Sequence, residues 1–149
     1  MDGNDAAVEA YHELCGYTLT RGDATFIHQH VVDAFAAQSA TPATKPIAIT
    51  FALVGLYLHL ERGVSGREVQ RAHMRMAREK HEWPRMTLPA ERGSMTAADV
   101  MRVPAGAARD AAIDDWCRSV WACYAGERDT IAALLERHRI QAARPGERG

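Results

Sequence analysis

The chain has 149 residues, a length that suits one domain able to bury a core without disulfide or metal staples. Hydrophobic residues make up 47% of it and charged residues 25%, which is typical of a globular protein. The formal net charge is −1, which excludes a globally basic nucleic-acid-binding chain and gives no sign of an acidic tail.

The cysteines and the N-terminal residues predict a cytoplasmic location. Cys15, Cys117 and Cys123 are odd in number and form no Cys-x-x-Cys pair, which favours a reducing compartment over a disulfide framework. Residues 1–5 are acidic and polar, unlike a signal peptide. The apolar run at residues 48–60 is shorter than the roughly twenty residues that cross a bilayer, so we expect no membrane segment.

All strong periodic patterns along the chain are helical, and no stretch alternates as a half-buried strand does. The predicted helices cover residues 6–19, 24–38, 46–61, 66–80, 96–103 and 107–140. Asp23 and Ser65 provide N-caps, Pro46 suits a first turn and Gly63 a left-handed C-cap, while Gly126 bends or interrupts the last helix. The fold class is therefore all-α, with residues 1–149 forming a single-domain bundle of five or six helices.

The centre of this bundle is predicted at about residues 46–61, because a helix that is apolar on every side must be surrounded by others. The termini, residues 1–5 and 142–149, are expected to be flexible. The first helix should bury a face containing Val8, Tyr11, Cys15 and Leu19. The second should bury Ile27, Val31, Ala34 and Phe35, which turns Gln29 and Asp33 outward.

One stripe of the central helix is made of small residues and ends in a histidine: Ala48, Ala52, Gly55 and His59. Either another helix packs closely against this stripe, or the stripe lines a cavity into which His59 points. Close packing is the commoner arrangement and is the one we expect.

Several histidines are predicted to gather between helices. A tight turn at Gly63 makes the third and fourth helices antiparallel, which brings His59 and His73 to within about one helical turn of each other. His28 and His30 flank the apolar stripe of the second helix. Bundle interiors hold metal ions through histidine and carboxylate ligands, so a divalent metal ion is one candidate cofactor. No His-x-x-x-His spacing occurs, and buried histidines bonded to backbone or carboxylates are the commoner explanation of such a pattern.

The fourth helix has a basic face made of Arg67, Arg71, Arg75 and Arg78. Such a face could bind phosphates or an acidic partner. No aromatic residue interleaves with these arginines and acidic residues flank them, so a solvated face is the better interpretation and nucleic-acid binding is not expected. Residues 81–94 are rich in proline and glycine and form a loop long enough to act as a lid.

A set of short motifs is spread over most of the chain: Tyr11-His12-Glu13-Leu14, Phe26-Ile27-His28-Gln29, Val32-Asp33, Gln38, Val54-Gly55-Leu56, Trp116 and Ser119-Val120-Trp121. In these motifs the chain resembles an uncharacterised bacterial family of small helical proteins that is catalogued as a domain of unknown function. Many members carry an N-terminal Cys-x-x-Cys segment that looks zinc-binding, and this chain lacks it. The resemblance singles out Glu13, His28, Gln29, Asp33 and Gln38 without implying a reaction.

These observations lead to two functional hypotheses. In the first, the protein binds a metal ion or small ligand through Glu13, His28, His30, His59 and His73, and an open metal position would allow catalysis. In the second, it is a non-catalytic module that forms a homodimer or binds a partner through the arginine face or the last helix. Whether the protein is an enzyme stays open.

Overall fold

The computed structural model describes residues 3–79 and 82–138, which form seven α-helices, one short 3-10 helix and no strand. The helices are α1 (Gly3–Thr20), α2 (His28–Ser39), α3 (Pro46–Arg62), α4 (Gly66–Ala77), α5 (Ala97–Met101), α6 (Ala107–Cys123), η1 (Ala125–Glu127) and α7 (Arg128–Arg137). The predicted all-α class is confirmed for this part of the chain. None of these helices is both long enough and apolar enough to span a bilayer.

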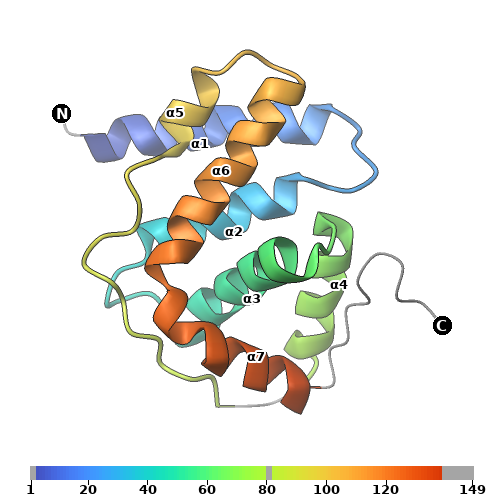
Figure 1. Ribbon diagram of the computed structural model, residues 1–149, viewed down its shortest axis with the longest axis vertical. Helices are drawn as coiled ribbons and strands as arrows, with labels where there is room; N and C mark the ends of the chain where they lie inside the picture. The colour runs from blue at the N-terminus through green and yellow to red at the C-terminus, as the bar shows by residue number, and fades with distance from the viewer. Residues whose placement is uncertain (1–2, 80–81, 139–149) are drawn as a thin grey trace.

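The helices α2 and α3 lie side by side, and α1, α4, α6 and α7 pack on this pair (Figure 1). The helix α1 packs on α2 and α5, whereas α4 and α7 pack on α3. The helix α6 runs across the molecule and contacts α2, α3 and α5. The candidate site described below lies where α2, α3 and α6 meet.

The helix α3 begins and ends as local chemistry predicts. Pro46 occupies its first turn, and Gly63 ends it in the left-handed conformation with φ 67°, donating its backbone N–H to the Leu58 carbonyl. Every residue from Ala52 to Leu58 is buried, in keeping with the apolar run. Ser65 then caps α4 by accepting a hydrogen bond from the Glu68 amide at 3.2 Å.

The second helix starts four residues later than predicted. The Asp23 carboxylate accepts hydrogen bonds from the backbone N–H groups of Thr25 and Ile27, but no helix begins at residue 24. Phe26 adopts φ 58°, a left-handed conformation that no helix can continue through. The resulting turn packs against α4, where Gly66 lies so close to the Phe26 carbonyl that a Cβ would be 1.8 Å from its oxygen.

The predicted last helix is two helices, which raises the number of α-helices above the expected five or six. The helix α6 ends before Tyr124, whose buried hydroxyl donates to the Ala37 carbonyl at 2.6 Å. The short turn η1, which contains Gly126, redirects the chain so that Ile131 and Leu134 are buried in α7. The predicted end near residue 140 lies outside the described residues.

The buried face of α1 also differs from the prediction. Leu19 is 57% exposed, whereas Ala10, Leu14 and Thr18 are buried. The helix α1 packs on α2 and α5, and the stripe that contains Ala10, Leu14 and Thr18 is the one that it buries there. Residues 3–5, expected to be flexible, belong to α1, and residues 142–149 lie outside the described part of the chain.

Candidate functional site

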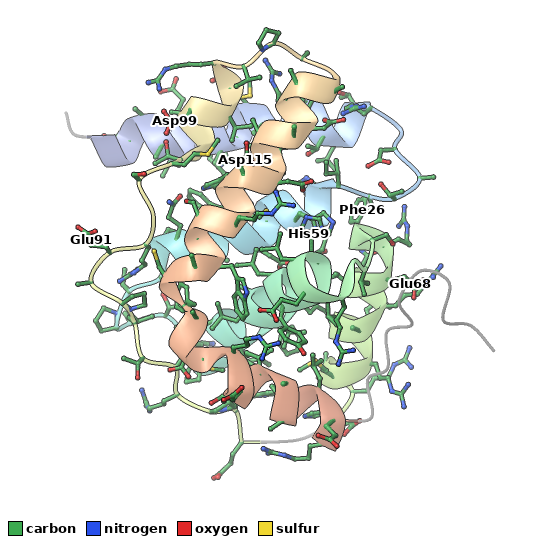
Figure 2. The ribbon with its side chains drawn as sticks, viewed as in Figure 1. Phe26, His59, Glu68, Glu91, Asp99 and Asp115 are labelled. Carbon is green, nitrogen blue, oxygen red and sulfur yellow. The ribbon has the colours of Figure 1, made fainter. Side chains whose placement is uncertain are left out.

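Two histidines from neighbouring helices stack face to face. The rings of His30 on α2 and His59 on α3 lie 3.5 Å apart between centroids, with an interplanar angle of 13°. Because Asp33 lies opposite Gly55, one helical turn along each helix, α2 and α3 run antiparallel here. Figure 2 labels His59, which lies in the last turn of α3.

Asp114 of α6 fixes the orientation of His59. The distance between His59 Nε2 and Asp114 Oδ1 is 2.8 Å, and the two side chains are 17% and 36% exposed. The hydrogen bond from His59 holds the pKa of the Asp114 carboxyl below its usual range. Because an ionised carboxylate only accepts hydrogen bonds, Nε2 of His59 is the donor in this bond, and the tautomer that the bond selects has its lone pair on Nδ1.

His30 lies deeper in the molecule and is neutral. It is 5% exposed, and its Nδ1 is buried without a hydrogen-bond partner. Burial, followed by the neighbouring His59, lowers the pKa of His30 from 6.5 to about 3. The Cys117 thiol donates to the backbone carbonyl of His30 at 3.6 Å and so holds α6 against this part of α2.

Asp33 fills the space that Gly55 leaves on α3. A Cβ atom at Gly55 would lie 1.8 Å from Asp33 Oδ2, so the small-residue stripe is packed by a helix at this position, as expected. Gln29 Nε2 donates to Asp33 Oδ1 at 3.1 Å, whereas Oδ2 is buried without a partner. Burial raises the pKa of the Asp33 carboxyl well above its usual range, although the bond from Gln29 opposes this shift.

The prediction that Asp33 points outward is therefore wrong, since its side chain is 3% exposed. A helical wheel assigns one inward face to a helix, but α2 is contacted by α1, α3, α4 and α6. A helix with neighbours on several sides buries polar positions as well as its apolar stripe. Gln38, near the other end of α2, is likewise structural: its amide accepts a bond from Trp116 Nε1 at 3.0 Å and donates to the carbonyls of Arg92 and Met95.

The other predicted site residues do not join His30 and His59. Glu13 is exposed on α1. His28 Nδ1 forms a hydrogen bond with the Thr18 hydroxyl at 2.9 Å, and His73 Nε2 donates to the Phe51 carbonyl at 2.7 Å. Two of the five predicted residues thus come together, and two others are satisfied by neighbouring groups.

Within residues 3–79 and 82–138, no group of three or more histidine, cysteine or acidic side chains is placed to hold a metal ion. The stacking of the His30 and His59 rings is one reason why this pair does not form part of a metal site. The nitrogen lone pairs lie in the ring planes, and two nearly parallel planes direct them side by side and not toward one point. A shared ion would require one ring to leave the stack.

Asp114 is the residue that sequence reasoning missed. It lies beside the apolar positions Ile113, Trp116 and Cys117 of α6, and this proximity to a buried stripe is the one local signal that it carries. Its partner is 55 positions away in the chain, so the pair appears only once α6 is packed on α3.

A comparison with protein-family models matches residues 5–125 to a family described as a family of unknown function, DUF5946. The chain belongs to the DUF5946 family. The region matched to DUF5946 contains His30, Asp33, His59 and Asp114, and it ends before α7. The resemblance to a domain of unknown function is thus confirmed. No curated protein and no solved structure matches the chain.

Proposed function

We propose that the protein binds a small ligand with an acidic O–H or N–H group at the edge of α3 and α6, where His59 Nδ1 accepts the ligand's proton. The supporting observation is the bond between His59 Nε2 and Asp114 Oδ1, at 2.8 Å. A carboxylate in this position selects the imidazole tautomer and stabilises the ring once it gains a proton. The stacked, neutral His30 limits rotation of His59.

The test is a fragment screen by NMR on the full chain, using phenols and hydroxamic acids as probes. We expect the His59 ring signals to shift on binding, His59→Gln to abolish binding, and Asp114→Asn to weaken it about tenfold through loss of a charge-assisted bond. Asp115→Asn is the matched control, because Asp115 is exposed and pairs with Arg118 on its own helix. Binding that survives in His59→Gln, or a screen without any shift at His59, would rule out the proposal.

Metal binding is the narrower form of the same proposal. An imidazole that donates one N–H to a carboxylate is well oriented to ligate a divalent ion through its other nitrogen. His30 would be the second ligand after turning out of the stack. Titration with Zn²⁺ should then shift both rings at one equivalent, and His30→Gln and His59→Gln should each remove this response. If Zn²⁺ does not bind stoichiometrically, metal binding is excluded, and the role proposed for His59 is only to accept a proton from the ligand.

The second candidate function is protein association through α4. Arg67, Arg71, Arg75 and Arg78 are exposed, and Met74 beside them is 55% exposed. A basic face with an exposed apolar side chain suits an acidic protein surface, including a second copy of this chain. If α4 mediates a dimer, reversing the charge with Arg71→Glu and Arg75→Glu should shift the sedimentation coefficient toward that of a monomer. An unchanged oligomeric state would exclude α4 as the dimer surface.

A further inference from the structure

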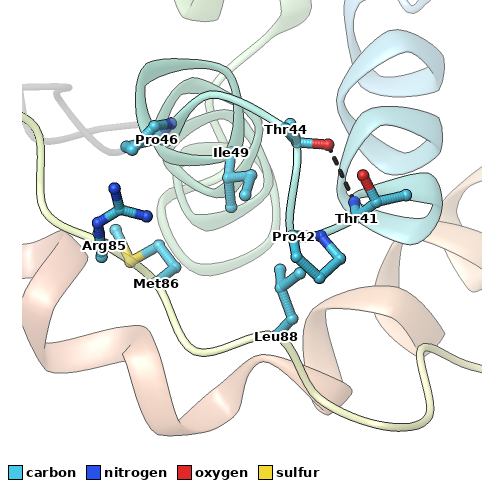
Figure 3. Close-up of a pocket in the computed structure, with 8 residues that line it drawn as sticks. All are labelled: Thr41, Pro42, Thr44, Pro46, Ile49, Arg85, Met86 and Leu88. Atoms are coloured by element: carbon cyan, nitrogen blue, oxygen red, sulfur yellow. Dashed lines mark hydrogen bonds between the residues drawn. The ribbon is translucent and has the colours of Figure 1, made fainter.

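A hollow in the molecule lies away from the histidine pair. It has a volume of about 290 Å³ and is formed by the α2–α3 connection, the first turn of α3 and residues 85–88 (Figure 3). Ile49 and His59 are ten residues apart on α3, which places the hollow about 15 Å from the histidines along the helix axis. The two sites are therefore separate, and a ligand in one leaves the other accessible.

The walls of the hollow are mainly apolar, and hydrogen bonds hold their backbone in place. Five side chains supply the apolar surface: Pro42, Pro46, Ile49, Met86 and Leu88. The Thr41 amide donates to the Thr44 hydroxyl at 2.9 Å, and Arg92 donates to the Ala40 carbonyl, which fixes the α2–α3 connection. On the other wall, the Thr87 amide donates to Glu127 at 3.0 Å. A ligand would thus meet a preformed cavity, which lowers the entropy cost of binding.

One cation lines this apolar hollow. Arg85 is exposed and forms no ion pair with any acidic side chain of the described residues. Figure 3 shows it on the same side as Pro46 and Met86, with Thr41 and Pro42 across the hollow. The Thr44 hydroxyl accepts its bond from Thr41, so its own proton is available to a ligand. The positive end of the α3 dipole lies at Pro46 and favours an anion in the same place.

We propose that this hollow binds a medium-chain carboxylate, with the hydrocarbon chain against Ile49, Met86 and Leu88 and the carboxylate on Arg85. A guanidinium binds a carboxylate through two parallel N–H bonds, which an alcohol cannot reproduce. The volume is at the small end of ligand cavities, which span about 300–1,000 Å³, so a long fatty acid does not fit. This inference is independent of the histidine site and goes beyond the function proposed for it.

The test is calorimetric titration of the full chain with sodium hexanoate, octanoate, decanoate and tetradecanoate, each below its micelle concentration. Affinity should rise about fourfold per buried methylene and stop rising once the hollow is full, before tetradecanoate. 1-Octanol, the uncharged match of octanoate, should bind at least tenfold more weakly. Equal affinity for octanoate and octanol, or no heat with any carboxylate, would overturn the proposal.

Three variants locate the site. Arg85→Gln should weaken octanoate binding at least tenfold and leave octanol unchanged, because it removes only the charged partner. Arg75→Gln, which changes another exposed arginine, on α4, should leave both affinities unchanged. Leu88→Trp should fill the hollow and abolish binding of both compounds, with an unchanged circular dichroism spectrum showing that the fold persists. Octanoate binding that is insensitive to both Arg85→Gln and Leu88→Trp would place the ligand elsewhere and refute the assignment.

Discussion

Replacing Gly55 with alanine should destabilise the protein by about 3 kcal/mol or more, at the upper end of the cost of overpacking a core. The added Cβ would lie 1.8 Å from Asp33 Oδ2 and 2.5 Å from Asp33 Cγ, distances that real atoms do not reach. Asp33 cannot yield easily, because it is 3% exposed and packed between α2 and α3. Urea denaturation of the Gly55→Ala variant at pH 7 measures the loss directly.

The same experiment identifies the contact responsible. Asp33→Ala removes the atoms that collide with the new methyl group, so the double variant should be more stable than the sum of the two single effects by about 2 kcal/mol. Gly16→Ala is the control: Gly16 lies inside α1 with nothing within 4 Å of its Cβ position, and alanine there should stabilise by about 0.5–1 kcal/mol. A Gly55→Ala protein as stable as the parent would contradict the close packing of α2 on α3.

Removing the imidazole of His30 should make the protein more resistant to acid. The pKa of His30 is about 3 in the folded protein, against the ordinary value of 6.5 in an unfolded chain, so below pH 6.5 the unfolded chain binds the proton first. Above pH 6.5, the protonation of His30 does not reduce the free energy of unfolding. As the pH falls from 6.5 toward 3, it reduces this free energy by about 1.4 kcal/mol per pH unit. At pH 4.5, His30 therefore lowers the free energy of unfolding by about 3 kcal/mol.

His30→Gln and His30→Phe both lack this titration, and urea denaturation at pH 7 and pH 4.5 tests it. The difference in unfolding free energy between variant and parent should move in the variant's favour by about 3 kcal/mol between the two pH values. Two different replacements are used because each alters packing in its own way, whereas the pH dependence should change equally in both. A parallel pH dependence in parent and variants would show that His30 is protonated in the folded state near its ordinary pKa.

Most of what could be predicted about this fold depends on local chemistry. The ends of α3 follow from Pro46 and Gly63, and the start of α4 follows from the hydroxyl of Ser65, because caps and turns involve residues close in the chain. The predictions failed where distant contacts decide. Gly126 indicates an interruption of the last helix, but α6 already ends before Tyr124, whose hydroxyl bonds the Ala37 carbonyl 87 positions away, and this pairing has no local signature.

Some features of the candidate site could likewise be predicted from local sequence, and others could not. Composition and periodicity by themselves identified an all-α chain, a small-residue stripe containing Gly55, and His30 and His59 as histidines near the core, because these are properties of single helices. Only the tertiary structure decided that His30 stacks on His59, that Asp114 orients it and that Asp33 is buried against Gly55. The physical reason is that the partner of a polar side chain, unlike its helical phase, depends on which helices pack together and in what direction.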